Sequence, residues 1–404
     1  MKDHELFAAA LNLPWPWYIQ EVDFEDEDDQ RVLHIHIGHR RRVKFSYENE
    51  TYSIYDHQVR QWEHLKFFQH RCIVHARVPR VKTEDGKVKL VEVPWAQAGS
   101  SFTLLYEDDV LNLTSGGMSN SKVAERLGIG AKRVFRIINR HVSHALSTQD
   151  LEPVKELSVD ETSAKKGHDY VTIMTDRERK KVVGVALGKD HDAFAHALID
   201  MEIRGADRKE VRAVTMDMSK SYIKAAKENL AQAAIVFDRF HIAKKLNEAV
   251  DEIRRQDQRE YKALKNSRYL WLKNNDKLSE KKREELECLS ASHPNIGKAY
   301  RLKEQFRAVF DEAQINWRVA PLREWMREAK KSKLDPILKF VAMLERHWYG
   351  IKSYFKRLST NAYAERVNLK IQEIKRSAKG YRNPYNFTIM IYFHLGGLDL
   401  KSTE

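Results

Sequence analysis

The feature that most limits the fold is the order of strand and helix patterns between residues 154 and 255. Three apolar runs suited to strands come first, at 154–160, 170–175 and 181–187. They are followed by a helix at 190–203, a strand at 211–216, a helix from Ser219 to Leu230, a strand at 234–237 and a helix that starts near Phe240. Three strands followed by alternating helices and strands predict a mixed α/β sheet.

Two aspartates are expected at the ends of strands in this sheet. Asp160 is predicted to end the first strand, and Asp217 the fourth. Ligands gather at strand ends in open α/β sheets. Each residue also has an ordinary alternative, since Asp160 could be a turn residue and Asp217 could help to start the helix at Ser219. The first and fourth strands can lie side by side in such a sheet, so both carboxylates could reach one divalent ion.

A late helix at 363–378 offers a third carboxylate. Two stripes run along it at helical spacing: one is mainly apolar (Tyr363, Val367, Ile371, Ile374, Ala378) and one is polar (Glu365, Asn368, Gln372, Arg376). Basic residues dominate this part of the chain, and Arg366, Lys370 and Arg376 are candidates for contacts with nucleic acid. Glu365 could complete a set with Asp160 and Asp217. Three hard oxygen ligands suit Mg²⁺, and Mn²⁺ can substitute.

Residues 119–139 have the spacing of a helix-turn-helix. Val123, Ala124 and Leu127 would anchor a first helix, Gly128 the turn, and Val134 with Ile137 a second helix. The outward positions Lys132, Arg133 and Arg136 could then reach the major groove of DNA and its phosphates. An ordinary helical hairpin is the alternative.

The remaining segments are predicted to be structural. Apolar and polar residues alternate at 33–47, 71–81 and 87–93, with a turn at Asp85-Gly86, so the first hundred residues are expected to form a small β-rich module. Residues 250–350 are rich in charge and contain four tryptophans, which favours a helical bundle with solvated outer faces.

Charge points to the partner. The chain has 71 basic and 58 acidic residues, a formal net charge of +13, which favours nucleic acid as the partner. No run approaches the roughly 20 apolar residues of a membrane span, and the first residues lack the pattern of a secretory signal. Cys72 and Cys288 lie too far apart to form a CxxC-pair zinc site or a disulfide framework. We expect a cytoplasmic, nucleoid-associated protein that contacts no membrane.

Four blocks of the sequence resemble the ISL3 group of bacterial insertion-sequence transposases, which carry an Asp-Asp-Glu (DDE) triad. The blocks are Ser158-Val-Asp-Glu-Thr-Ser-Ala-Lys-Lys-Gly-His-Asp-Tyr170, Thr215-Met-Asp-Met-Ser219, Phe237-Asp-Arg-Phe-His-Ile-Ala-Lys-Lys-Leu246 and Thr360-Asn-Ala-Tyr-Ala-Glu-Arg-Val-Asn368. They occur in the family's order and spacing. The resemblance extends from about residue 45 to residue 397.

The resemblance implies an RNase H-like catalytic core interrupted by an all-helical insertion, with Asp160, Asp217 and Glu365 as the triad around two Mg²⁺ ions. Asp238 and His241 match a family motif whose histidine lies near the active site. A structural role for His241 is the alternative. The predicted domains are a β-rich DNA-binding module at 1–98, a helix-turn-helix at 99–150, the core at 151–245 and 351–404, and the insertion at 246–350.

The N-terminal module departs from the family. Family members usually carry a zinc ribbon there, and its ligand positions fall at Phe45, Glu48, Thr83 and Gly86 in this sequence. None of these can hold zinc as a Cys₃His set. We therefore expect a degenerate ribbon in which Phe45 replaces the metal by packing, and no stoichiometric zinc.

These observations favour a cut-and-paste transposase that binds the terminal inverted repeats of its own element and target DNA as a dimer or a larger assembly. A transposase-derived DNA-binding regulator that no longer cuts is the alternative, motivated by the lost zinc ligands. A structure-selective nuclease would use the same triad, but it would have no need of the helix-turn-helix.

Overall fold

The computed structural model describes residues 3–27, 30–48, 50–164, 169–316, 319–357 and 362–400, without the side chains of residues 3, 312–316, 357 and 362–365. The chain forms two compact units. The N-terminal unit covers Met1–Ala145 together with the chain end from Asp399, and the second unit covers Leu146–Leu398. No helix in the described parts is long and apolar enough to cross a membrane.

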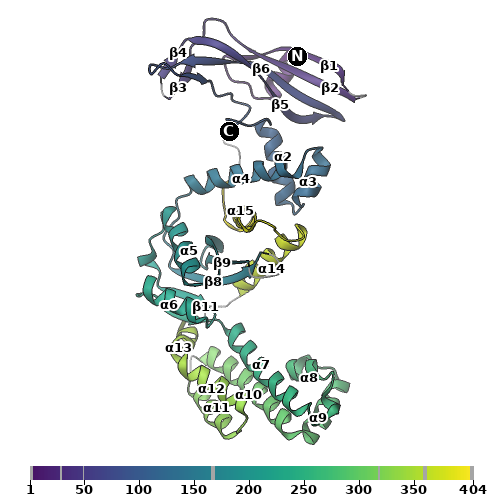
Figure 1. Cartoon of the computed structure of the whole chain (residues 1–404), viewed down its shortest axis with the longest axis vertical. Helices are drawn as coiled ribbons and strands as arrows, with labels where there is room; N and C mark the ends of the chain where they lie inside the picture. The colour runs from purple at the N-terminus through teal and green to yellow at the C-terminus, as the bar shows by residue number, and fades with distance from the viewer. Residues whose placement is uncertain are drawn as a thin grey trace. The chain divides into compact units, whose positions relative to one another are not determined.

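The N-terminal unit contains a sheet in the order β1-β2-β6-β5, with β7 beside β6 (Figure 1). Strands β2 and β6 are parallel, and the other neighbours are antiparallel. Strands β3 and β4 form a separate hairpin. The elements of this region are α1 (Asp3–Ala10), β1 (Trp17–Glu27), β2 (Gln30–His39), β3 (Phe45–Tyr47), β4 (Glu50–Tyr52), β5 (Ile54–Phe67), β6 (His70–Lys82) and β7 (Val88–Leu90).

The two faces of this sheet differ in chemistry because side chains alternate along each strand. One face packs an apolar core that includes Leu33, Ile35 and Val74. The other face carries Asp23, Glu25 and Glu27 of β1, together with histidines of β2 and β6. The strands expected near 33–37, 43–47, 71–81 and 87–93 are present. Strands β1 and β5 were not predicted, since their acidic and polar residues hide the apolar alternation.

Three helices complete the N-terminal unit: α2 (Leu104–Ser115), α3 (Asn120–Leu127) and α4 (Ala131–Thr148), the last of which crosses the division between the units. Ser119 caps α3 by accepting a hydrogen bond from the Lys122 amide, and Gly128 ends the helix with φ +73°. Val123, Val134 and Ile137 are buried. The anchors and the turn expected for the helix-turn-helix are therefore in place.

The second unit contains a five-stranded sheet in the order β10-β9-β8-β11-β12. Strands β8, β9 and β10 are antiparallel neighbours, whereas β8, β11 and β12 run parallel. The predicted mixed sheet is thus confirmed, with the first and fourth predicted strands side by side. Its elements and first helices are β8 (Glu156–Ser163), β9 (Tyr170–Asp176), β10 (Lys181–Leu187), α5 (His191–Ile203), a short 3-10 helix (Arg208–Glu210), β11 (Ala213–Met216), α6 (Lys220–Asn229) and β12 (Ala234–Phe237).

One expectation for this sheet is wrong. Asp160 does not end its strand, because β8 continues to Ser163. The parallel pairing of β8 with β11 stops at Ser158, but its antiparallel pairing with β9 runs on to Ser163. Asp160 therefore lies inside a strand, at the point where one of its two neighbours has ended.

Helices cover both faces of the sheet. Helix α5 packs so closely on β10 that a Cβ on Gly184 would lie 2.3 Å from the carbonyl oxygen of Ala197. Tyr222 of α6 shares a hydrogen bond with Thr172 of β9, which pairs with Glu161 of β8. Helix α14 (Ala362–Ser377) instead donates hydrogen bonds to Asp160 and Thr162 of β8. Consecutive residues of a strand face opposite sides. Helices α6 and α14 therefore lie on opposite faces, with α15 (Pro384–Leu395) following α14 (Figure 1).

Helices also fill the chain between β12 and α14. They are α7 (Arg239–Asp257), α8 (Arg268–Leu272), α9 (Glu280–Ser292), α10 (Pro294–Asn316), α11 (Ala320–Lys331), α12 (Asp335–Arg346) and α13 (Trp348–Arg357), with 3-10 turns at Lys262–Leu264 and Asn275–Lys277. Their apolar residues join those of the sheet in one core. Helix α13 meets β12 at Gly350, where a Cβ would lie 2.4 Å from the Phe237 ring.

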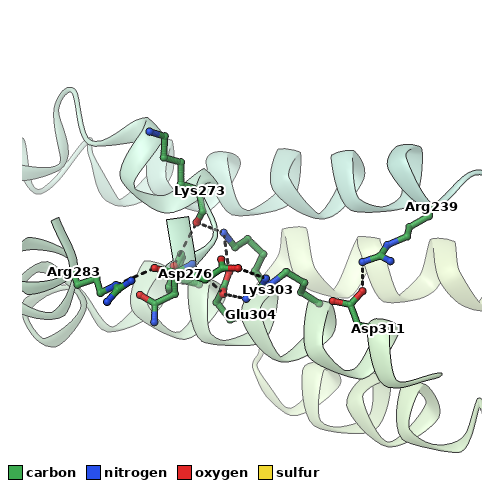
Figure 2. Close-up of polar contacts among 10 residues, drawn as sticks. Arg239, Lys273, Asp276, Arg283, Lys303, Glu304 and Asp311 are labelled. Atoms are coloured by element: carbon green, nitrogen blue, oxygen red, sulfur yellow. Dashed lines mark hydrogen bonds and ion pairs between the residues drawn. The ribbon is translucent and has the colours of Figure 1, made fainter. Parts of the chain in front are cut away.

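A buried lysine ties two of these helices together (Figure 2). Lys303 of α10 donates to the carbonyl oxygens of Trp271, Leu272 and Lys273, at 3.0, 3.3 and 2.7 Å. These carbonyls end α8, where a positive charge is favoured. Glu304 lies 3.2 Å from the same ammonium group, and burial lowers the pKa of Lys303. The charged residues of this region thus include structural ones as well as solvated ones.

Candidate active site and nucleic-acid interface

Three aspartates lie at corresponding positions on or just after the neighbouring strands β8, β11 and β12 of the second sheet. Thr215 of β11 pairs with Ser158 of β8, so continuing the parallel register by two residues places Asp217 opposite Asp160. Met216 pairs with Phe237 of β12, so the next step places Asp217 opposite Asp238. Neighbouring strands lie about 4.8 Å apart. The parallel register of β8 with β11 therefore places Asp160 and Asp217 opposite each other, and their joint role in holding an ion stays a prediction.

Backbone amides hold one oxygen of each of these two carboxylates. Asp160 Oδ1 accepts from the Glu161 amide at 2.8 Å, and Asp217 Oδ1 accepts from the Ser219 amide at 2.8 Å. Both residues are half-buried. The ordinary role considered for Asp217, at the start of the following helix, is thus also present. Ser219 occupies the cap position of α6 without capping it through its own side chain.

Helix α14 lies along β8 on the face that carries Asp160. Asn368 Nδ2 donates to Asp160 Oδ2 at 2.6 Å, and Gln372 Nε2 donates to Thr162 at 3.4 Å. Lys375 continues this row by donating to Ser163 at 2.9 Å. Residue 365 lies one turn before Asn368 on the same helical face. The side chain of Glu365 is outside the described residues, so its predicted role stays a prediction.

Sequence reasoning missed Glu161. Burial together with the negative charges of Asp217 and Asp160 raises its pKa, while His241 and Lys189 act in the opposite direction. The same three carboxylates, together with burial, raise the pKa of Tyr222. The adjacent Asp-Glu pair was the only available signal, and strand alternation alone would have assigned Glu161 to the other face.

His241 lies in the first turn of α7, which begins after Asp238. Asp238 caps this helix by accepting from the Phe240 amide at 2.8 Å, and its other oxygen lies 3.9 Å from His241 Nε2. His241 is close enough to act electrostatically on Glu161. Asp238 is thus a local partner of His241, as a structural role would require. The active-site role of His241 stays a prediction.

The donor chemistry of this edge fits a hard divalent cation. Asp160, Asp217 and Glu161 offer carboxylate oxygens. Burial and, after it, the charges of Asp217 and Asp160 raise the pKa of Glu161, and a cation would relieve the repulsion among these charges. Among described side chains, no three donor atoms at this edge lie within 4.8 Å of one another. A third ligand would have to come from α14, where Glu365 is expected.

The three cationic residues predicted on the second helix of the helix-turn-helix are all exposed on α4. Arg133 is engaged within its own unit, because its guanidinium donates to Ser101 Oγ at 3.2 Å and lies 4.6 Å from the centre of the Phe102 ring. In the described part of the chain, the side chains of Lys132 and Arg136 form no hydrogen bond or ion pair. These two are therefore better placed than Arg133 to contact a nucleic acid.

The basic residues predicted on α14 differ in their surroundings. Arg366 and Arg376 are exposed, whereas Lys370 is half-buried and lies 3.4 Å from Glu373. Arg376 was placed on the stripe with Asn368 and Gln372, but Lys375 is the residue that reaches β8.

The positions expected for zinc-ribbon ligands hold no zinc-binding set. Phe45 is buried and packs against Trp17 and His39, with ring centres 5.5 and 5.4 Å away. Glu48, Thr83 and Gly86 lie in or beside turns. Cys72 is buried in the apolar core, and burial raises its pKa to about 12, so it is not available as a thiolate. Packing around Phe45 is present as expected.

Comparison with known proteins agrees with these arrangements. The transposase model of the ISL3 family matches residues 157–391, and the model for the helix-turn-helix domain of that family matches residues 91–142. The transposase for insertion sequence element IS1001 of Bordetella parapertussis is 24% identical over 392 residues, which cover 93% of this chain and 95% of that protein. The transposase for IS1557 of Mycobacterium tuberculosis is 25% identical over 433 residues, with coverage of 98% and 96%. The chain is a DDE transposase that belongs to the ISL3 family of insertion-sequence transposases.

Proposed function

We propose that this transposase binds the terminal inverted repeats of its element and catalyses Mg²⁺-dependent DNA cleavage and strand transfer by a cut-and-paste route. The observation that carries the proposal is the pair Asp160 and Asp217 at neighbouring parallel strands, with Asn368 of α14 bonded to Asp160. The strand order β10-β9-β8-β11-β12 supports an RNase H-like core.

The domain boundaries of the proposal follow the sequence prediction. A β-rich module at 1–98 and a helix-turn-helix at 99–150 precede the core at 151–245 and 351–404. The segment at 246–350 is the helical insertion between the two parts of the core. Helices α8 to α12 within that segment support this division.

Asp160, Asp217 and Glu365 would hold two Mg²⁺ ions, and Mn²⁺ could replace them. Such ions, when bound, activate water or a 3′-hydroxyl and stabilise the leaving oxygen of a phosphodiester. The chain's own contribution is orientation. The amides of Glu161 and Ser219 fix one oxygen each of Asp160 and Asp217, and Asn368 fixes the second oxygen of Asp160. Because Asn368 is neutral, it orients the carboxylate without cancelling its charge.

His241 is proposed as an active-site residue because of its effect on Glu161 and its place after Asp238. Its imidazole can donate or accept a hydrogen bond beside these carboxylates. Arg366, Lys370 and Arg376 on the neighbouring helix α14 are proposed to contact DNA phosphates.

Base reading is assigned to α4, with Lys132, Arg133 and Arg136 as the predicted contacts. Major-groove contacts distinguish base pairs, whereas phosphate contacts position the protein. The exposed Arg136 is the strongest candidate for a base contact. Arg133 would have to leave Ser101 and Phe102 to make one.

Two element ends have to be held at once, so we propose at least a dimer with two-fold symmetry. The proposed place of action is the bacterial nucleoid in the cytoplasm. Size-exclusion chromatography with light scattering, with and without end DNA, measures the assembly. A species with one chain on two paired ends would contradict the dimer.

A plasmid carrying both element ends tests the reaction. Incubation with the protein and Mg²⁺ should release the element with free 3′-hydroxyls and then join it to target DNA. Sequence-specific binding without any strand cleavage would instead support the regulator alternative. Cleavage that depends on DNA structure and ignores the end sequence would indicate a nuclease.

A further inference from the structure

The polar face of the N-terminal sheet gathers acids and histidines on adjacent strands. Asp23, Glu25 and Glu27 alternate along β1, and Asp23 pairs with His34 of β2. His36 of β2 pairs with His75 of β6. The three histidine rings are stacked, with centres 5.1 Å apart between His34 and His75 and 4.8 Å apart between His36 and His75. This face lies opposite the apolar face of the same sheet, and it belongs to the N-terminal unit, whereas the proposed active site belongs to the second unit.

Within this face, His34 carries a buried nitrogen that lacks a partner. The residue is 5% exposed, and its Nε2 forms no hydrogen bond in the described structure. The nearest acidic oxygens, from Glu27 and Glu25, lie 3.5 and 3.9 Å away. A buried polar atom without a partner is unfavourable, so this one calls for an explanation.

The spacing of these atoms is that of ligands around a shared ion. The donor atoms of Glu25, Glu27 and His34 all lie within 4.8 Å of one another, the one group of three or more that meets this condition in the described residues. Ligand atoms about 2.0–2.2 Å from a tetrahedral zinc lie about 3.3–3.6 Å apart. The separation of 3.5 Å between His34 Nε2 and Glu27 is too long for a hydrogen bond but matches that value.

His75 prepares His34 for such a role. The two rings share a hydrogen bond of 2.9 Å between His34 Nδ1 and His75 Nε2. When His34 Nδ1 donates in this bond, the lone pair of its Nε2 stays available to an ion beside the oxygens of Glu27 and Glu25, which lie 3.5 and 3.9 Å away. Outer partners of this kind fix the tautomer of metal-bound histidines.

We propose that Glu25, Glu27 and His34 form a binding site for a divalent transition-metal ion of the zinc type, with His75 as its outer partner. One imidazole and two carboxylates are ligands that zinc accepts, and they leave a fourth position for water. The imidazole nitrogen favours zinc over magnesium or calcium, which prefer oxygen. The ion would join β1 to β2 and neutralise acidic charge on this face.

Two neighbours complete the surroundings of the site. Arg71 lies 3.9 Å from the second oxygen of Glu27, but its main partner is Glu63, which accepts two hydrogen bonds of 3.1 Å. Asp23 Oδ1 is also buried without a hydrogen bond and lies 3.5 Å from His36 Nε2. The competing account is a protonated His34 that pairs electrostatically with both glutamates, without any ion.

The expectation of no stoichiometric zinc rested on the missing Cys₃His set. The β1–β2 site uses a different donor set, which that expectation did not consider. It needs no thiolate, and it shares none of the four positions aligned with the family's zinc ribbon.

Zinc titration of the full chain tests the site. The protein is first freed of metal with a chelator, and Zn²⁺ is then titrated against a chromophoric chelator in excess Mg²⁺, which keeps oxygen-only sites filled. The variants are E27Q, H34Q and H75Q. The matched control is H57Q, since His57 stacks on His39 with a ring-to-ring hydrogen bond of 2.9 Å but is not part of the three-residue cluster.

The wild-type chain and H57Q should bind one zinc with equal affinity. E27Q and H34Q should weaken binding at least tenfold, and H75Q should weaken it by about 10–100-fold, the usual effect of an outer partner. Glu27 is exposed, so E27Q decides the matter if H34Q fails to fold. Absence of zinc binding in the wild type, or equal affinity in wild type and E27Q, would overturn the site and leave the ion pair of a protonated His34.

Discussion

The two sheets of this transposase both collect acidic side chains, but they do so in different ways. In the second unit, Asp160 and Asp217 come from strands far apart in sequence, and the parallel register of β8 with β11 places them opposite each other. In the N-terminal unit, Asp23, Glu25 and Glu27 come from one strand and share a face because side chains alternate. The first arrangement depends on topology and the second on periodicity.

The surroundings of the carboxylates differ as well. Backbone amides and Asn368, all neutral donors, hold Asp160 and Asp217. In the N-terminal sheet, histidines of β2 and β6 are the neighbours of Glu25 and Glu27. Oxygen donors alone favour magnesium, whereas the added imidazole favours zinc. The comparison shows that the metal an acidic cluster favours depends on the other donor atoms beside its carboxylates.

Metal removal should give the largest effect and should affect the two sheets differently. Chelation with EDTA should abolish cleavage of end DNA, because the carboxylates alone cannot activate the attacking oxygen. Added Mg²⁺ or Mn²⁺ should restore cleavage, and Zn²⁺ at the N-terminal sheet should not be needed. A gel assay for cleaved ends measures this. Full cleavage in EDTA would contradict the account of the second sheet.

Phe45→Ala should damage the N-terminal sheet and spare the second one. Truncating a buried phenylalanine costs about 3–5 kcal/mol of the free energy of unfolding. Hydrogen exchange of peptides from residues 17–82 under mild denaturant measures the local loss. The control is Phe68→Ala, because Phe68 is 80% exposed and its removal should change stability by less than about 0.5 kcal/mol. Equal effects of the two variants would show that Phe45 does not anchor this sheet.

Asn368→Ala should weaken catalysis without changing the acids themselves. Loss of its hydrogen bond to Asp160 should lower the cleavage rate by about 10–100-fold. Gln372→Ala is the matched control on the same helix, since its hydrogen bond to Thr162 is long, at 3.4 Å, and it should change the rate little. Single-turnover cleavage rates decide between them. A normal rate for Asn368→Ala would remove it from the site.

Arg136→Ala should alter recognition rather than chemistry and should give the smallest effect. Its loss should reduce the preference for cognate over scrambled ends by about 1–3 kcal/mol if it contacts a base. Lys132→Ala should instead weaken both DNAs equally and reduce the salt slope by about one unit. Binding titrations over a range of salt separate the two roles. Equal weakening of both DNAs by Arg136→Ala would make α4 a backbone clamp.

Much of the second sheet could be predicted from sequence because its strands are short and mostly apolar, and because clear helices flank β11 and β12. Local pattern also sufficed for the helix-turn-helix, where Gly128 and the buried Val134 and Ile137 fix the turn and the second helix. The position of Asp160 was predicted less accurately. A strand ends where its last neighbour stops pairing with it. The pairing of β8 with β11 stops at Ser158, but its pairing with β9 continues to Ser163.

The parts that could not be predicted depend on pairing between distant strands. The acids of β1 look like a solvated loop until their pairing with β2 and the stacked histidines is known. Glu161 was missed because strand alternation points it away from Asp160. Its pKa is nevertheless raised by burial and by the charges of Asp217 and Asp160. The contacts of Arg133 with Ser101 and Phe102 likewise could not be predicted, because they depend on tertiary structure.

The most direct test of the central claim compares two aspartates that are alike in local structure but not in place. Asp217 and Asp207 each accept a hydrogen bond of 2.8 Å from the amide two residues ahead, but Asp217 follows β11 beside Asp160 and Asp207 precedes β11. Cleavage of end DNA in Mg²⁺ should be lost in Asp217→Asn and normal in Asp207→Asn, with DNA binding retained in both. Cleavage by Asp217→Asn at the rate of Asp207→Asn would contradict the claim that this strand end holds the catalytic metal.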